Sequence, residues 1–194
     1  KGSMIVMYKK IFVTMIISTI LFFNIVCAFN DTTGHWAEPY ASALYNMDIL
    51  KGDDNDNANL AANIKRVEFL ALIVRSIYRE DEIIDGDKSF IDVFSDSWYY
   101  DIASFAKTKG IVLGDDTGRL LPEDNIKREE IVLMIVRAFE LKGSVADFTD
   151  IDKDYQYYDE ICAATENKII NGYEDGSFGP KQPATRGEAA AMIS

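Results

Sequence analysis

The sequence predicts a mainly α-helical protein made of three helix-loop-helix repeats, packed as a pseudo-threefold cluster around a central three-helix bundle. The first observation behind this is a glycine that recurs at three places in front of a polar loop. The second is an arginine that follows each glycine after 14 residues, in the pairs Gly52 and Arg66, Gly114 and Arg128, Gly172 and Arg186. A fixed spacing inside units that are joined by connectors of variable length is typical of structural repeats.

The first helix of each repeat follows a short aromatic motif. Phenylalanine stands two residues before aspartate in all three copies, as Phe29 and Asp31, Phe90 and Asp92, Phe148 and Asp150. Segments of helical length come next, at 37–47, 101–109 and 159–167. Each segment ends in an apolar stretch closed by Gly52, Gly114 or Gly172. We expect these glycines to adopt the left-handed conformation that other residues resist and so to end the helices.

The second helix of each repeat has one apolar stripe. Val67, Leu70, Ala71 and Val74 lie at i, i+3, i+4 and i+7, and Ile131, Met134, Ile135 and Ala138 repeat the spacing. One such stripe is too small to be buried alone, so the three second helices are expected to share a core. The predicted repeats span 29–80, 90–141 and 148–194. The last helix is expected to be short, because the position matching Arg137 would fall after Ser194.

The first 28 residues have the pattern of a secretory signal peptide. Lys9 and Lys10 precede an apolar run over 11–26, and small side chains close it at 26–28. We therefore assign 1–28 to a signal peptide and leave 1–3, which precede the first methionine, out of the fold. A retained membrane helix is the alternative, although the run is shorter than the usual ~20 apolar residues. Cys27 leaves lipidation as a minor second alternative.

Charge and composition limit the partners and cofactors. The chain carries a formal net charge of −12, and 1–28 holds three lysines and no acid, so the remainder has −15. Such a chain repels nucleic acid and anionic membrane surfaces. A single histidine, His35, supplies neither a conventional zinc site nor a Ser/His pair. The acidic loop at 53–57 lacks the glycine and glutamate of a calcium loop. We expect no cofactor and no metal, and a buried packing role for Cys162.

The motifs together resemble the S-layer homology family. The matching segments are Gly34-His35-Trp36-Ala37, the DGSFGP loop at 175–180 and Thr185-Arg186-Gly187-Glu188, and the resemblance covers 29–194. It implies a secreted, non-catalytic module that holds proteins in the cell wall or S-layer of Gram-positive bacteria. Its implied partner is a pyruvylated polysaccharide attached to peptidoglycan, bound in grooves between repeats. The alternatives are a structural protein that self-associates in a surface lattice, or the anchor fragment of a larger surface enzyme.

The resemblance also implies the binding residues. Arg66, Arg128 and Arg186 are the candidates to meet the pyruvate carboxylate, which suits the planar fork of arginine. Lys65 and Lys127 add charge at helix starts, where anions are favoured. The other members of the predicted ligand-binding set are Trp36, Trp98, Asp31, Asp92, Gly52, Gly114 and Gly172. The alternative for the arginines is a bond to loop carbonyls or to a glutamate of another repeat. For the two tryptophans, a core position is favoured over a platform for sugars.

Helix caps complete the expected roles. Thr185 and Glu188 have the spacing of a capping box, and Glu68 and Glu130 are expected to keep part of it. Lysine cannot accept a backbone N–H, so Lys65 and Lys127 lose the side-chain cap. Repeat three has Gln156 where the tryptophan would be, and repeat one lacks the DGSFGP-type loop. Three equivalent binding grooves are therefore not expected.

Overall fold

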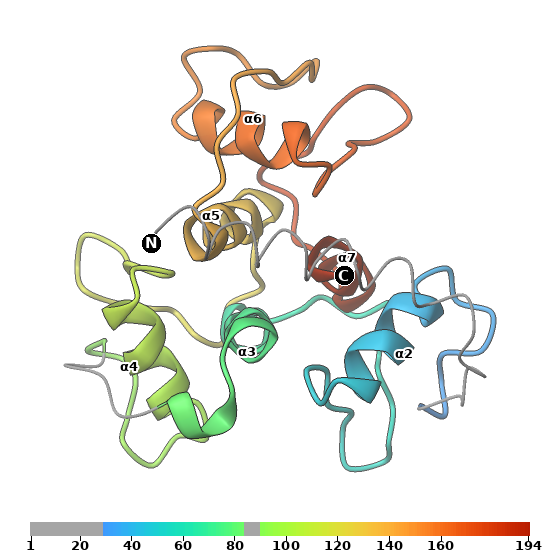
Figure 1. The fold of residues 1–194 in the computed structure, drawn as a ribbon, viewed down its shortest axis with the longest axis vertical. Coiled ribbons are helices and arrows are strands. Elements are labelled where there is room, and N and C mark those ends of the chain that lie inside the picture. The colour runs from blue at the N-terminus through green and yellow to red at the C-terminus, as the bar shows by residue number, and fades with distance from the viewer. Residues whose placement is uncertain (1–28, 84–89) are drawn as a thin grey trace, which may run out of the picture. The chain divides into compact units, whose positions relative to one another are not determined.

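The computed structural model describes residues 29–83 and 90–194 (Figure 1). The segment predicted to be a signal peptide lies outside the described residues. The elements are α2 (Glu38–Asn46), α3 (Arg66–Ile77), η2 (Glu80–Glu82), α4 (Tyr100–Thr108), α5 (Arg128–Phe139), α6 (Tyr158–Glu166) and α7 (Arg186–Ile193). Within the described ranges no strand is formed, and two isolated bridges join Lys65 to Asn125 and Lys127 to Pro183. The predicted mainly α class is confirmed.

The helices alternate in length in the order that the sequence predicts. The first helices α2, α4 and α6 each have nine residues, and their bounds fall within one residue of the expected segments. The second helices α3 and α5 have twelve residues each, while α7 has eight. In the part of the chain that is described, no helix has both the length and the apolar character needed to cross a membrane.

The described chain forms two compact units. One contains residues up to Ala62 together with 185–192 and Ser194, and the other contains 63–184 and Ile193. The second helices α3 and α5 belong to the 63–184 unit, whereas nearly all of α7 belongs to the first. The pseudo-threefold arrangement of all three repeats stays a prediction.

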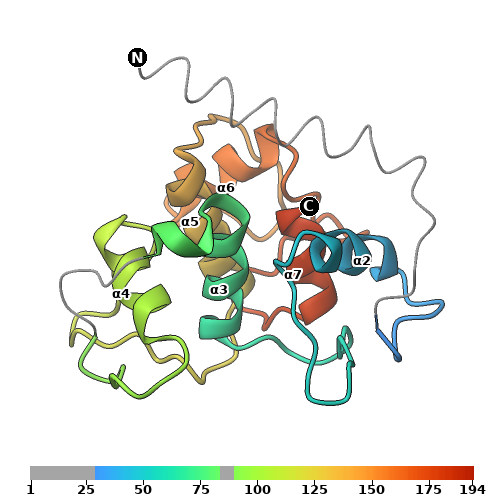
Figure 2. The same cartoon turned by 60° about the horizontal axis from the view of Figure 1, so that its bottom comes forward.

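In the 63–184 unit, each second helix packs against the first helix of the following repeat. α3 contacts α4 and α5, and α5 contacts α6 (Figure 2). Tyr78, which follows α3, meets Phe105 of α4 edge to face, with ring centroids 4.9 Å apart. Both predicted apolar stripes are buried: Val67, Leu70, Ala71 and Val74 on α3, and Ile131, Met134, Ile135 and Ala138 on α5. The repeat is thus a unit of sequence, but its core is completed by its neighbour.

The first helices end in a left-handed residue four positions before the predicted glycine. These residues are Asp48, Gly110 and Lys168, with φ of 59°, 70° and 61°. The isoleucine that follows each one donates its amide to a carbonyl of the last helical turn, at 2.9 Å in all three copies. Gly114 and Gly172 also have positive φ, but Gly52 does not. The predicted left-handed conformation is therefore confirmed at Gly114 and Gly172 and wrong at Gly52, and the helices themselves end before all three glycines.

Close packing against phenylalanine explains the three glycines instead. A Cβ added at Gly52, Gly114 or Gly172 would lie 3.0, 2.8 or 2.6 Å from the nearest ring atom of Phe29, Phe90 or Phe148, respectively. No side chain fits at such distances without displacing the ring. The phenylalanine that opens each repeat and the glycine that follows its first helix are therefore two halves of one contact.

The left-handed residues give a test of the fold. Replacing Lys168 by glycine is expected to raise the free energy of unfolding by up to about 1 kcal/mol, because a left-handed conformation costs other residues ~1–2 kcal/mol and glycine's flexibility in the unfolded chain offsets part of the gain. Gly110→Ala is expected to lower it by about 1 kcal/mol, with no steric contribution, since nothing lies within 4 Å of the added Cβ. Urea unfolding measures both. Changes of the same sign in the two variants would contradict the assignment.

Candidate functional site

The second helix of each repeat begins by donating backbone amides to the loop of another repeat. In the 63–184 unit these bonds run from Arg66 to Asp124 (2.8 Å), Val67 to Pro122 (3.1 Å), Arg128 to Gln182 (3.0 Å) and Glu129 to Pro180 (3.0 Å). In the other unit they run from Arg186 to Ala62 and from Gly187 to Leu60, both at 2.9 Å. An isolated helix leaves its first amides unpaired. Here a loop from elsewhere in the sequence satisfies them.

A closed triangle of backbone hydrogen bonds lies just before these helices. The amide of Ile64 donates to Ala184, that of Ala184 to Ile126, and that of Ile126 to Ile64, each at 3.0 Å. All three residues are buried and belong to the 63–184 unit. The triangle fixes the relative register of the segments that lead into the three arginines.

The arginine side chains reach the same loops. Arg66 donates through Nη1 to the carbonyls of Leu120 (3.2 Å) and Leu121 (2.8 Å), and through Nη2 to Glu130 (2.7 Å). Arg128 donates through Nε to Phe178 (2.9 Å). Arg186 donates through Nε to Ala58 (2.7 Å) and through Nη2 to Lys51 (3.3 Å). Loop carbonyls are thus bound by all three arginines, and Arg66 also binds a glutamate of another repeat.

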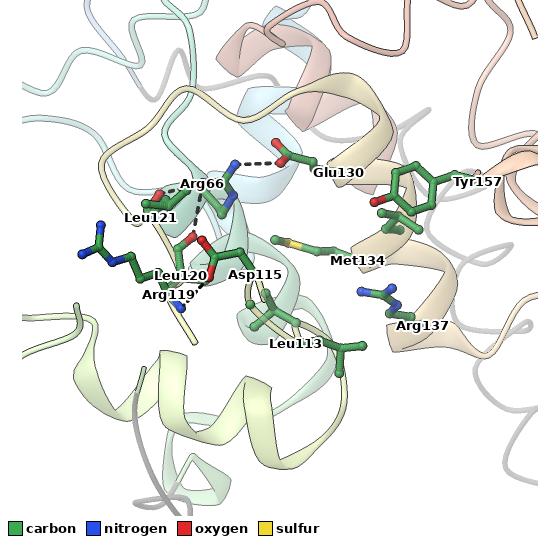
Figure 3. Close-up of a pocket in the computed structure, with 13 residues that line it drawn as sticks. Arg66, Leu113, Asp115, Arg119, Leu120, Leu121, Glu130, Met134, Arg137 and Tyr157 are labelled. Carbon is green, nitrogen blue, oxygen red and sulfur yellow. Dashed lines mark hydrogen bonds and ion pairs between the residues drawn. The ribbon is translucent and has the colours of Figure 1, made fainter. Parts of the chain in front are cut away.

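Arg66 forms one wall of a pocket of about 260 Å³ (Figure 3). The pocket lies wholly in the 63–184 unit, between the loop of repeat two, one face of α5 and the start of α6. Its lining residues are Arg66, Val112, Leu113, Gly114, Asp115, Arg119, Leu120, Leu121, Glu130, Leu133, Met134, Arg137 and Tyr157. Of the predicted ligand-binding residues, the pocket brings together Arg66 and Gly114.

The charges in this pocket are partly committed to the protein. The guanidinium of Arg66 has five N–H donors, and the three bonds above leave two of them for a ligand. The carboxylate of Asp115 accepts from the amides of Thr117 and Arg119 and from the Thr117 hydroxyl. These bonds, with the Arg119 amide first, hold the pKa of Asp115 below its usual value, so this acid stays ionised. The negative charge of Asp115 is therefore stabilised by hydrogen bonds within its own turn.

The predicted aspartates hold the loops in place. Both oxygens of Asp92 accept loop amides, from Leu120 and Leu121 at 2.8 Å each. Asp31 does the same for Ala58 and Asn59, at 2.7 Å each. Asp150 repeats the arrangement with Phe178 and Gly179. Asp92 thus positions the residues whose carbonyls Arg66 binds, which is how the opening motif of repeat two supports the pocket.

The capping glutamates lie where the sequence predicts them. Glu68, Glu130 and Glu188 each accept the amide of the residue before the helix, at 2.9, 2.8 and 2.8 Å. The hydroxyl of Thr185 also accepts the Glu188 amide, which completes that capping box at 3.2 Å. Lys65 and Lys127 make no side-chain cap. Instead, the ammonium of Lys65 lies 2.5 Å from Glu123 on the exposed surface, and Lys127 is exposed.

Both tryptophans lie on the surface. Trp36 and Trp98 are 58 % and 60 % exposed, so the expectation that they favour the core was wrong. Each stands immediately before the residue that precedes a first helix, and that residue, Ala37 or Tyr99, is the buried one. Neither tryptophan lines the pocket beside Arg66. In each of these two repeats the residue after the tryptophan faces the core and the tryptophan faces solvent. The number of aromatic residues in the segment does not indicate which of them is buried.

Arg128 and its neighbours form a second polar cluster that the sequence did not predict. The guanidinium carbon of Arg128 lies 4.6 Å from the ring centre of Tyr173 and 5.2 Å from that of Phe178. Next to it in sequence, the buried Glu129 binds the Lys181 ammonium at 2.7 Å and accepts from the Tyr155 hydroxyl at 2.5 Å. Burial, together with this bond to a carboxylate, raises the pKa of Tyr155, and the bond to Glu129 raises that of Lys181. The surroundings of Arg128 are thus occupied by side chains of repeats two and three.

The acidic loop of repeat one is held together by one of its own carboxylates. The Asp53 carboxylate accepts from the amides of Asn55 and Asn57 and from the side chain of Asn59. The backbone bond to Asn57 is the largest reason why the pKa of Asp53 falls to about 2. Across the described ranges, no cluster of histidine, cysteine and acidic side chains could hold a metal ion. Cys162 is buried and unpaired with any other cysteine of those ranges.

Asp92 provides a test of the loop geometry. Asp92→Asn keeps the shape but turns one acceptor into a donor that faces a backbone amide, so the free energy of unfolding is expected to fall by about 1–3 kcal/mol. Chemical unfolding measures the loss. The matched control is Asp96→Asn, the same change at an exposed position of the same segment. Equal stability of the two variants would show that the Asp92 bonds do not hold the loop.

Comparison with known proteins identifies related segments. A family model described as S-layer homology domain matches residues 28–59, 89–132 and 147–190. The chain is 33% identical over 174 residues to an amylopullulanase of Thermoanaerobacterium thermosulfurigenes, which covers 85% of this chain and 9% of that protein. It is 30% identical over 174 residues to a surface-layer 125 kDa protein of Lysinibacillus sphaericus, covering 86% and 14%. A cellulosome-anchoring protein of Acetivibrio thermocellus is 25% identical over 145 residues, covering 72% and 32%.

The matched segment is a small part of each of these relatives. The chain spans less than a third of the length of all three proteins. The similarity therefore concerns a module that they share, whatever else each of them contains.

Proposed function

The chain belongs to the S-layer homology domain family, and from this premise we propose that it is a non-catalytic module that anchors protein at the bacterial cell surface. Its ligand is an acidic, pyruvylated polysaccharide of the cell wall. Proteins named as an amylopullulanase, an exoglucanase and a surface-layer protein share this same segment with the chain. A segment common to proteins with such different names supports a function other than any one catalytic activity, and attachment to the surface is a function that all of them can use.

The pocket beside Arg66 is the observation that carries the proposal. Two remaining N–H donors on Arg66 suit a carboxylate, since arginine binds such groups through parallel hydrogen bonds. Leu113 and Met134 supply apolar surface for the faces of sugar rings. We therefore assign the acidic sugar to this pocket, with the exposed faces of Trp36 and Trp98 as further platforms for the polymer.

The other two arginines are proposed as weaker sites. Arg128 is 5 % exposed and stacks on two aromatic rings of repeat three, which leaves less room for a ligand. Arg186 is half-buried and binds two loop carbonyls of repeat one. Lys65 already pairs with Glu123, so its charge serves the ligand less directly than the sequence predicts.

Binding to wall material tests the proposed function. Purified protein is expected to sediment with native cell-wall sacculi and to remain in solution with sacculi whose pyruvyl groups have been removed. Binding to native sacculi should weaken as salt rises, because ions screen the attraction between the carboxylate and arginine. Equal sedimentation with both preparations would contradict pyruvate recognition, and no sedimentation with either would contradict wall binding.

A surface variant separates binding from folding, because Arg66 itself also supports the structure. Leu113 lines the pocket and is 58 % exposed, so Leu113→Asp is expected to leave the fold intact. It places a negative charge beside the bound acid, and the affinity for native sacculi should fall about tenfold or more. Val145→Asp is the matched control, since Val145 is 63 % exposed and does not line the pocket. The same loss of binding in both variants would argue against this pocket.

Self-assembly is a second candidate function, favoured by exposed apolar residues in repeat two. Ile91 and Phe94 are 64 % and 65 % exposed, and one relative is a surface-layer protein. Analytical ultracentrifugation in the absence of wall material distinguishes the two functions: growth of large oligomers with concentration would favour a lattice over an anchor. In a longer protein, either function would serve whatever domain the chain is attached to.

A further inference from the structure

Arg137 is a half-buried cation of the pocket that forms no ion pair with any residue the structure describes, whereas Arg119 is exposed at the rim. The pocket holds three arginines, Arg66, Arg119 and Arg137, and two acids, Asp115 and Glu130. Arg66 is paired with Glu130, and Asp115 is bonded to its own turn. Among the residues that the structure describes, none forms a hydrogen bond or an ion pair with the Arg137 side chain. A half-buried arginine without such a partner is ready to receive an anion.

The place of Arg137 on α5 puts it at the far end of the pocket from Arg66. Glu130, Met134 and Arg137 follow one another at i, i+4 and i+7, so they share one face of the helix. Seven residues of α-helix advance by about 10 Å. Glu130 holds the guanidinium of Arg66 at one end, and Arg137 stands two turns further along. The pocket floor is therefore charged at both ends and apolar between them.

Figure 3 shows how these side chains lie. Arg66 and Glu130 meet at one side, Met134 occupies the middle, and the guanidinium of Arg137 points over the pocket on the side of Leu113. The ring of Tyr157 stands between Glu130 and Arg137 with its hydroxyl directed inward. Arg119, by contrast, points away from the centre. Apolar side chains, Leu113 and Met134 among them, line the middle, and arginine N–H donors lie at both ends.

A structural role at the end of the helix does not account for Arg137. Basic residues in a last turn often bond the final carbonyls of a helix. In α5, backbone amides already perform this function: the Glu140 amide donates to Arg137 and the Leu141 amide to Val136. Glu140 itself adopts the left-handed conformation that closes the helix, with φ of 52°. The guanidinium is therefore not needed as a cap.

We propose that Arg137 is a specificity-determining residue that binds a second anionic group of the polysaccharide, on a different sugar from the one bound at Arg66. The inference rests on the proposed function and extends it. The pocket then selects an acidic oligosaccharide with charged groups about 10 Å apart, the separation set by two turns of α5. A saccharide with a single acidic sugar fills only the Arg66 end. The repeating acidic polymer of a wall satisfies both ends at once.

The test uses two size fractions of the soluble polysaccharide released from sacculi: fragments with one acidic sugar and fragments with two. Isothermal titration calorimetry on the full chain should show tighter binding of the two-acid fragment by about ten- to a hundredfold, the range for a charged hydrogen bond. Arg137→Gln should abolish this preference and leave the affinity for the one-acid fragment unchanged. Since Arg137 has no side-chain partner among the described residues, the melting temperature of the Arg137→Gln variant should equal that of the original chain.

Two controls of equal charge isolate the contact. Arg119→Gln removes a charge at the rim of the same pocket, and Arg79→Gln removes one that pairs with Asp81 at the surface. Both variants should retain the preference for the two-acid fragment. A loss of preference in Arg119→Gln equal to that in Arg137→Gln would replace the proposed contact by a general field effect and overturn the inference.

The remaining outcomes are also decisive. If Arg137→Gln keeps the preference, or weakens both fragments alike, the two-group site is wrong while the proposed function stands. If the original chain binds neither the fragments nor the sacculi, the proposed function fails, and the inference fails with it. The two failures are therefore distinguishable from the behaviour of the unmodified protein.

Discussion

Hydrogen bonds from the start of one repeat's second helix to the loop of another repeat organise everything that the structure describes. The helix needs them because its first amides have no partners of their own. The loop needs them because its carbonyls would otherwise lack donors in a partly buried place. The unpaired amides of the helix and the unpaired carbonyls of the loop satisfy each other. The backbone amides of residues such as Arg66 and Val67 donate to the loop, and the arginine side chain donates to it again. Each repeat depends on another repeat for part of its hydrogen bonding, so a single repeat is expected to be unstable by itself.

The same bonds give the motif arginine a structural role alongside the binding role proposed for it. In the pocket of the 63–184 unit, Arg66 uses three of its five N–H donors to bind the loop and Glu130, and the other two are the ones that the proposed function assigns to a ligand. Its pairing with Glu130 stabilises the buried charge but also reduces the attraction for an incoming acid. Under the proposed function, a ligand would therefore be held by the geometry of several groups rather than by one strong charge. The same pairing makes the unneutralised Arg137 important.

Much of the fold could be predicted, because it depends on local patterns. The apolar stripe of α3, the short α7 and the cap at Thr185 follow from periodicity and from the spacing of a few residue types. Contacts between distant positions could not be derived in this way. The choice of Asp48 and Lys168 as left-handed residues contradicts their intrinsic preference, and neighbouring structure imposes it. The exposure of Trp36 likewise depends on which residue of an aromatic cluster faces the core.

The candidate site shows the same division. Sequence spacing predicted the three arginines, but not that Arg66 would meet Glu130 of the next repeat, nor that Tyr155, Glu129 and Lys181 would close the surroundings of Arg128. The sequence predicted no binding role for Arg137, which served only to align the repeats. The one available signal was its place on the helix face of Glu130, seven residues earlier, which gains meaning once Glu130 is known to lie in the pocket.

The pairing of the last described helix with the first repeat has a consequence for the order in which contacts form during folding. Arg186 binds Ala58 across 128 residues of sequence, whereas Arg128 and Phe178 are separated by 50. Contacts of long sequence separation form late, because closing a longer loop costs more entropy. The contacts of Arg66 and Arg128 lie within 63–184 and need no part of α7. The loop of repeat one gains its partner only when Arg186 reaches it, so repeat one is expected to be completed after the contacts within 63–184 have formed.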